Sequence, residues 1–218
     1  MADLRKEPKP PEPGLDHDPL EESQLLEGDP VEVLEVRGEW ARVAAPDQPE
    51  WTHNRKWEGY PGWMRITDLA PEPAGKTEES KTGTGYAVPG TDLRDRITQA
   101  ARGFLGVPYY WGGRSPRAVD CSGLTGLCYQ AAGVRIPRDA HEQWMKARPI
   151  SRENLQPGDL VFLADPEDAL KITHVMLYAG EGRVIEAPGT GSAVREIPLE
   201  ERLASARDRR AYFGSYLE

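Results

Sequence analysis

The chain has 218 residues and a formal net charge of −9, with 27 lysines and arginines against 36 aspartates and glutamates. This length allows one medium domain, or a small domain beside one of about 130 residues. The negative charge repels nucleic acid and anionic lipid, and no apolar run approaches the roughly 18 residues that span a bilayer. We therefore expect neither nucleic acid nor a membrane as a partner.

The start of the sequence gives an indication of where the protein is located. Met1 is followed by charged and proline-rich sequence, without the apolar core of a signal peptide. This favours a cytoplasmic protein, although a periplasmic or extracellular protein whose signal peptide had been removed would show the same sequence. Nothing in the composition indicates an oligomeric state.

Thiol and imidazole groups are sparse. Cys121 and Cys128 are separated by seven positions of one predicted helix, roughly 10 Å, which is too far for a disulfide. The four histidines are scattered, and neither cysteine has a second ligand at zinc-type spacing. We therefore expect two free thiols, no metal and no other cofactor.

Two segments have the composition of connecting chain. Residues 1–20 carry five prolines among charges, a composition that buries little apolar surface, and we expect a tail or an extended arm there. Residues 71–90 are rich in proline, glycine, threonine and charge, which predicts a linker. The domain boundary is therefore placed between 71 and 90.

Residues 21–70 read as a small all-β domain. Short alternating apolar stretches are separated by glycine turns, a pattern typical of a small barrel. Trp51, Trp57 and Tyr60 lie in an otherwise polar loop of this stretch. They are either core of the barrel or a wall that faces a ligand, and the two readings have equal weight.

Helices and then strands are predicted from residue 91 onward. Thr91 is placed to cap a helix with an apolar face that ends before Gly106. A second helix is predicted to begin at Cys121, and a third after Asp139, with Glu142 positioned as in a capping box. Five strands are predicted at 159–163, 174–178, 183–186, 194–197 and 212–217. This order indicates an α+β fold with helices packed on an antiparallel sheet.

Cys121 is the candidate nucleophile. Asp120 is a good N-cap, so Cys121 falls in the first helical turn, where backbone N–H groups and the helix dipole favour a negative charge. Such placement is expected to lower a thiol pKa from about 8.5 toward the range of reactive cysteines. Cys128 belongs to the apolar stripe of the same helix and is expected to be a small core residue.

His174 and Glu186 supply the partners that a nucleophilic thiol needs. They lie 12 residues apart on two predicted strands that are joined by the turn 180–182. In a hairpin, this even separation places both side chains on one face, directly across or on the diagonal. His174 is then able to accept the thiol proton while Glu186 binds the other imidazole nitrogen, as in a catalytic triad.

Five motifs in order resemble those of the NlpC-type cell-wall cysteine peptidases: GVPYYWGG (106–113), DCSGL (120–124), IPRD (136–139), PGDL (157–160) and THV (173–175). The resemblance covers residues 91–218 and implies a papain-like domain that cleaves peptidoglycan stem peptides, often after γ-linked D-glutamate. Residues 21–70, with GYPGW at 59–63, resemble a bacterial SH3-like domain. Together they resemble the subset that cuts γ-D-glutamyl–L-diamino acid bonds in peptides with a free N-terminal L-alanine.

The resemblance also implies residue roles. Cys121 is the nucleophile, His174 is the base, and Tyr109 lies near the oxyanion. Asp120 and Ser122 line the substrate pocket, and Tyr60 closes the cleft around the amino end of the substrate. An acidic barrel residue is expected to bind the substrate ammonium, and the candidates are Glu22, Glu27 and Asp29.

One position departs from the resemblance. The third triad residue is most often histidine in this family, and here it is Glu186. A carboxylate can orient the imidazole equally well, so the change does not predict an inactive enzyme. Two alternatives remain: a module that binds cell-wall peptide beside an inactive papain-like domain, and an amidase or acyltransferase on the same fold.

Overall fold

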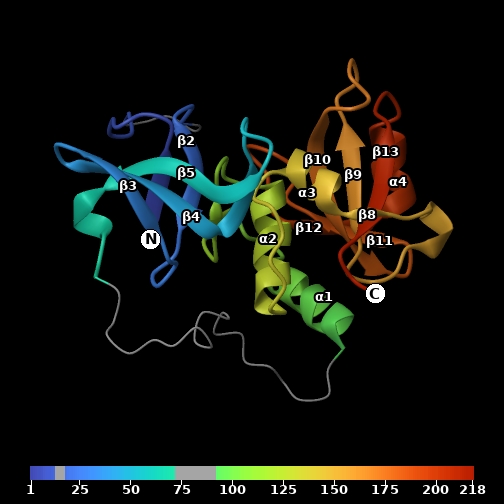
Figure 1. Cartoon of the computed structure of the whole chain (residues 1–218). Coiled ribbons are helices and arrows are strands. Elements are labelled where there is room, and N and C mark those ends of the chain that lie inside the picture. The colour runs from blue at the N-terminus through green and yellow to red at the C-terminus, as the bar shows by residue number, and fades with distance from the viewer. Residues whose placement is uncertain (13–17, 72–91) are drawn as a thin grey trace.

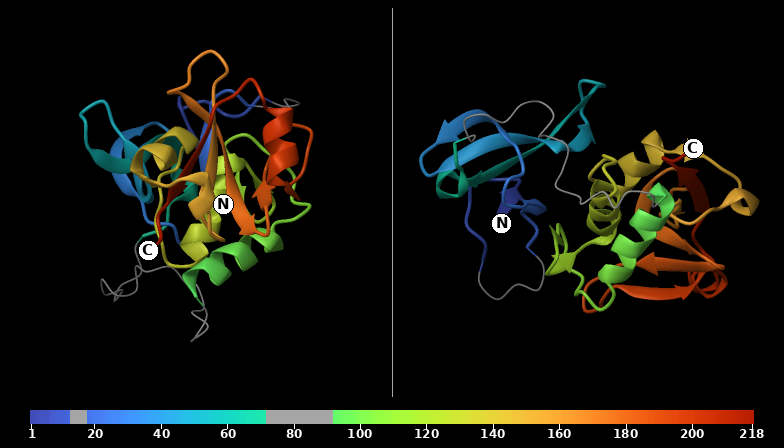
Figure 2. Two further views of the ribbon diagram at one scale, coloured as in Figure 1. Left: turned by 90° about the vertical axis from the view of Figure 1, so that its right-hand side faces the viewer. Right: turned by 90° about the horizontal axis from the view of Figure 1, so that it is seen from below.

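A computed structural model describes residues 1–12, 18–71 and 92–218, which form a β-rich N-terminal region beside an α+β region (Figures 1 and 2). Nearly all of the predicted linker at 71–90, and Thr91, lie outside the described residues. Asp92 caps the first helix instead, since its carboxylate accepts the Arg94 N–H at 3.3 Å.

The N-terminal region is one antiparallel five-stranded sheet in the order β2-β1-β5-β4-β3. Its strands are β1 (Ala2–Arg5), β2 (Glu21–Leu25), β3 (Glu32–Arg37), β4 (Trp40–Trp51) and β5 (Trp57–Arg65), followed by the 3₁₀ helix η1 (Ile66–Asp68). Its small apolar core includes Leu4, Val43, Ala45 and Met64. This β-rich region is consistent with the predicted SH3-like domain.

The interpretation of residues 1–20 as a tail is wrong at their beginning. Residues 2–5 form β1, which pairs with β2 and contacts β5. Ala2 and Leu4 alternate into the core, and the buried Arg5 guanidinium donates to Asp18 at 2.8 Å. The four-residue strand is too short to stand out beside the prolines that follow it, and its partners are supplied by the rest of the sheet.

The C-terminal region is a six-stranded sheet in the order β12-β11-β10-β9-β13-β8, with helices on both faces. The strands are β8 (Arg148–Pro149), β9 (Leu160–Ala164), β10 (Ile172–Gly180), β11 (Arg183–Glu186), β12 (Arg195–Pro198) and β13 (Ala211–Ser215). The helices are α1 (Leu93–Gly103), α2 (Cys121–Ala131), α3 (Ala140–Lys146) and α4 (Leu199–Ser205), with a two-stranded ribbon of β6 (Arg114–Ser115) and β7 (Ala118–Val119) and the 3₁₀ helix η3 (Arg152–Asn154). The predicted α+β class is confirmed.

Alternating residues of the central strands divide the core into two layers. Leu160 and Phe162 face one layer with α1, α2 and α3, all of which contact β10. Val161 and Leu163 face the other layer, which is covered by α4 through Leu199. The helix α4 was absent from the sequence prediction.

The predicted capping box of α3 does not form. Asp139 precedes the helix but makes no side-chain cap bond. It accepts the Tyr60 hydroxyl at 3.3 Å, and Glu142 accepts the Trp51 N–H at 2.8 Å. Both carboxylates therefore face the barrel, and the start of α3 belongs to the contact between the two regions (Figure 1).

Candidate active site

Cys121 is the first residue of α2, as predicted. The Asp120 carboxylate caps the helix by accepting the Gly123 N–H at 2.6 Å. A Cβ at Gly123 would lie 2.1 Å from the Gly113 carbonyl oxygen, so only glycine lets the 106–113 loop lie against this turn. The helix start and the loop thereby form one rigid support for the thiol.

The thiol of Cys121 lies beside β10. The Val175 N–H bonds to it, which places the sulfur next to the residue that follows His174. Burial, with the Asp120 charge, raises the pKa of Cys121 to about 12, while the Val175 N–H opposes this. The expected lowering of the thiol pKa is therefore wrong, because desolvation and the capping carboxylate outweigh the helix terminus. Cys128 is fully buried in the core, as expected.

His174 and Glu186 meet across the β10–β11 hairpin. Leu177 pairs with Ile185 and Tyr178 with Val184, so continuing the register puts His174 on the diagonal from Glu186 and on the same face. The His174 Nε2 and Glu186 Oε2 atoms are 2.7 Å apart. With Nε2 engaged as a donor, Nδ1 is the ring nitrogen left to accept a thiol proton.

Two arginines also bind Glu186, and the sequence prediction contained neither. Arg195 of β12 donates to Oε1 through Nε at 3.1 Å and Nη2 at 2.7 Å, and Arg202 of α4 donates to Oε2 at 2.8 Å. Burial raises the pKa of Glu186, but the bonds from His174, Arg202 and Arg195 outweigh burial and bring it to about 2. Glu186 is therefore a carboxylate at neutral pH.

His174 is held in its neutral form. Burial lowers the pKa of His174, and Arg202 and Arg209 act in the same direction, against the opposing effect of Glu186. A neutral imidazole and a protonated thiol are the forms from which a general base takes the proton of a nucleophile during attack.

Tyr109 lies in the same neighbourhood. Its backbone is fixed by an N–H bond to the Ser192 carbonyl at 2.8 Å. Burial and the nearby Cys121 and Asp120 raise the pKa of its phenol, so Tyr109 keeps its proton and is available as a donor. The role near the oxyanion that the resemblance implies for Tyr109 stays a prediction.

Asp120 and Ser122 are bound to Arg138, which the sequence motifs contained without a role. Its guanidinium donates to both Asp120 oxygens, at 3.1 and 2.7 Å, and to the Ser122 hydroxyl at 2.9 Å. It also reaches the barrel, through the Ser23 hydroxyl at 2.7 Å and a backbone N–H bond to the Pro49 carbonyl at 3.1 Å. A buried arginine thus joins the cap of the nucleophile's helix to the other domain.

Tyr60 and Glu22 of the barrel meet Asp139 of the C-terminal region at this junction. The Tyr60 hydroxyl lies 3.3 Å from both Glu22 and Asp139. Of the other two acidic candidates, Glu27 is exposed and Asp29 is paired with Arg114 at 2.7 Å. Glu22 is therefore the candidate that lies with Tyr60.

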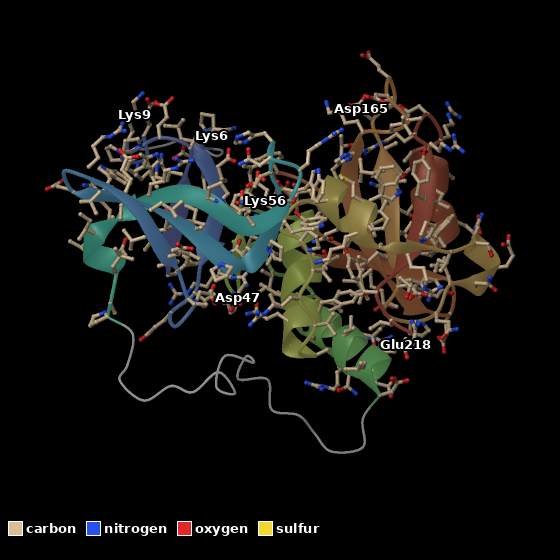
Figure 3. All side chains as sticks on the ribbon, viewed as in Figure 1. Lys6, Lys9, Asp47, Lys56, Asp165 and Glu218 are labelled. Carbon is tan, nitrogen blue, oxygen red and sulfur yellow. The ribbon has the colours of Figure 1, made fainter. Side chains whose placement is uncertain are left out.

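Trp51 and Trp57 are not part of the barrel core. They lie at the end of the β4–β5 hairpin with their rings 5.3 Å apart, and Lys146 of α3 lies 4.9 Å above Trp57. The hairpin end that carries Lys56 extends over the helices of the C-terminal region (Figure 3). The two indoles therefore lie outside the core of the barrel, whereas Tyr60 is in it.

The part of the chain that the structure describes contains no group of three or more His, Cys, Asp or Glu side chains able to hold a metal ion. Within the same residues, no helix is long and apolar enough to cross a membrane.

Comparisons with known proteins give the family. The NlpC/P60 family model matches residues 106–212. The chain is 30% identical to the gamma-D-glutamyl-L-lysine dipeptidyl-peptidase of Bacillus cereus (85% of this chain, 74% of that protein) and 30% identical to that of Bacillus subtilis (87% and 80%). A crystal structure of an NlpC/P60 family protein from Bacillus cereus superposes with a TM-score of 0.74 at 26% identity, over 91% of this chain and 83% of that chain. The chain therefore belongs to the NlpC/P60 family of peptidases, with their papain-like fold.

Proposed function

We propose that this peptidase hydrolyses the bond between a γ-D-glutamyl residue and the following L-diamino acid, lysine or diaminopimelate, in peptidoglycan stem peptides with a free N-terminal L-alanine. The observation that carries the proposal is the Cys121 thiol beside β10, with His174 bound to Glu186 at 2.7 Å. The two Bacillus relatives are named for the same bond with lysine, which supports this substrate class.

The proposed reaction begins with attack by Cys121. The sulfur bonds to the γ-carbonyl carbon while His174 takes the thiol proton, and the carbonyl oxygen becomes an oxyanion. Collapse breaks the carbon–nitrogen bond, and His174 gives its proton to the leaving amine. Water then attacks the thioester, His174 takes a proton from the water, and the carbon–sulfur bond breaks to restore the thiol.

Donors for the oxyanion are proposed at the start of α2. The N–H groups of Gly123 and Leu124 are already bound to the side chain and the carbonyl of Asp120. The proposal therefore assigns the oxyanion to the Cys121 N–H and to the protonated Tyr109 hydroxyl. Such donors stabilise charge that develops only in the transition state.

The barrel is proposed to bind the amino end of the substrate. Glu22 and Asp139 converge on the Tyr60 hydroxyl within a chain of net negative charge, an environment that favours an ammonium group. In an intact wall the alanine nitrogen is in an amide bond, so recognition of a free amine supports recycling of released peptides in the cytoplasm. Cleavage of intact sacculi as fast as the free tripeptide would contradict this.

The decisive test uses the two cysteines as a matched pair. Cys121→Ala is expected to abolish release of lysine or diaminopimelate from L-Ala-γ-D-Glu-diamino acid peptides, because no thioester can form. Cys128→Ala, a change in the core of the same helix, is the control for folding and is expected to keep turnover. Full activity of Cys121→Ala, measured by mass spectrometry of the products, would overturn the proposal.

A further inference from the structure

Glu186 is enclosed by cations from two further elements. Its side chain is fully buried, and each oxygen accepts from an arginine, Oε1 from Arg195 and Oε2 from Arg202. The Arg202 side chain is 12% exposed, and its Nη1 also donates to the Ser205 hydroxyl within α4 at 3.2 Å. Arg202 is therefore fixed by its own helix when it meets the carboxylate.

These cations oppose what a buried carboxylate does to an adjacent imidazole. A negative charge in contact with histidine stabilises the imidazolium and raises its pKa. At His174 this effect of Glu186 is outweighed by burial and by Arg202 and Arg209. Glu186, at the third position of the proposed triad, is therefore charged, while His174 remains neutral and able to accept a proton.

The charged groups that act on His174 come from β11, α4 and the segment before β13. Glu186 is on β11, Arg202 is on α4, and Cys121 is on α2. Arg209 precedes β13 and is anchored by its Nε to the Ala164 carbonyl at 2.7 Å and by a contact with the Thr173 hydroxyl. These contacts hold the Arg209 cation beside the residue that precedes His174, where its charge opposes protonation of the imidazole.

We propose that Arg202, assisted by Arg195, is a positioning residue that neutralises Glu186, so that the carboxylate orients His174 without holding it protonated. This inference rests on the proposed thiol mechanism. The two arginines cancel the charge that Glu186 adds, so this glutamate can orient the imidazole as a neutral side chain would. Arg195 has the smaller share because its side chain is 50% exposed, and solvent screens its charge.

The test follows the pH dependence of Cys121 alkylation by iodoacetamide, a readout that needs no peptide substrate. Removing the Arg202 charge lets Glu186 hold the proton on His174 to higher pH. Arg202→Gln is therefore expected to move the acidic half-point of the alkylation profile upward by about one pH unit. Arg202→Lys keeps the charge and is expected to restore the wild-type half-point.

The control is Arg183→Gln, which removes an arginine from β11 that pairs with Glu196 at 3.0 Å and does not bind Glu186. Arg183→Gln is expected to leave the half-point in place, and Cys121→Ala gives the blank for alkylation. Arg195→Gln, at a half-exposed position, is expected to fold and to give a smaller shift in the same direction.

Two results would overturn the inference: an unshifted half-point in Arg202→Gln and Arg195→Gln, or equal shifts in Arg202→Lys and Arg202→Gln. If Arg202→Gln does not fold, Arg195→Gln decides alone. Failure of the proposed function is seen separately, as peptide hydrolysis that survives Cys121→Ala.

Discussion

The two sides of the candidate site place opposite charges around a buried side chain, acidic groups around a phenol on one side and basic groups around a carboxylate on the other. On the barrel side, Glu22 and Asp139 gather at Tyr60, and a salt bridge from Glu22 reaches the exposed Lys6 at 2.7 Å. On the sheet side, Arg195 and Arg202 surround the single carboxylate of Glu186.

The difference in charge indicates which kind of group each side of the site favours. In the proposed reaction, the acidic side suits a substrate ammonium, and the basic side opposes protonation of the imidazole. Asp120 is paired with Arg138, which opposes in part the effect of the Asp120 charge on the thiol. Charge is therefore matched locally at each group, in a chain with an overall charge of −9.

The largest effect is expected where the two sides are joined. Arg138→Gln leaves the buried Asp120 carboxylate without its cation, and loss of one partner of a buried pair costs about 3 to 5 kcal/mol. We expect the free energy of unfolding to fall by this amount in urea, with loss of peptidase activity. Arg135→Gln, whose side chain is half exposed and pairs with Asp47 at the same junction, is the control. Equal effects of the two changes would show that the burial of Arg138 is unimportant.

A smaller effect is expected on the barrel side. Glu22→Gln removes a charge that is proposed to bind the substrate ammonium, and a hydrogen bond to a charged group contributes about 1.5 to 3 kcal/mol. We expect KM for a free tripeptide to rise about 10- to 100-fold with little change in kcat. For an N-acetylated peptide, which has no ammonium group, we expect wild type and Glu22→Gln to have the same KM. The exposed Glu27→Gln is the control. An unchanged KM in Glu22→Gln would remove Glu22 from the substrate site.

The smallest effect concerns a buried carboxylate between the domains. Glu21 accepts the Tyr110 hydroxyl at 2.8 Å, and burial, with the Asp3 charge, raises the pKa of Glu21 to about 7. The pKa of Glu21 in the folded protein lies above the unfolded value of 4.5. The free energy of unfolding is therefore highest below pH 4.5, and it falls as pH rises from 4.5 through 7.

Glu21→Gln removes that titration. Relative to wild type, the variant is expected to be more stable at pH 8 than at pH 6 by about 1.3 kcal/mol, measured by urea unfolding at both pH values. Glu196→Gln, at the surface pair with Arg183, is the control and is expected to show no such difference. Parallel stability curves for wild type and Glu21→Gln would contradict the raised pKa.

Local patterns in the sequence were sufficient for most of the C-terminal region. The five predicted strands lie within about two residues of their observed positions. The even spacing of His174 and Glu186 predicted that they share a face, and the register then places them on the diagonal. The helix α4 was missed although Leu199 and Leu203 lie four residues apart, because seven residues give only two apolar positions. Arg202 was missed with its helix.

Contacts between distant segments were beyond local patterns. Arg138 was visible in a motif, but its partner Ser23 lies 115 residues away in another domain. The thiol pKa was misjudged for a similar reason, since burial of Cys121 depends on elements that fold around it, and the sequence shows only the helix start. Asp139 and Glu142 likewise have the spacing of a local cap but bind the barrel.

The Arg138 bridge also bears on the order in which the protein is made. The five barrel strands end at Arg65, so the sheet that carries Ser23 and the Pro49 carbonyl is complete before the ribosome has added α2. Domains generally fold as units during synthesis, the N-terminal one first. We therefore expect the N-terminal sheet to be folded when α2 and Arg138 are synthesised, so that the helix packs against an existing surface.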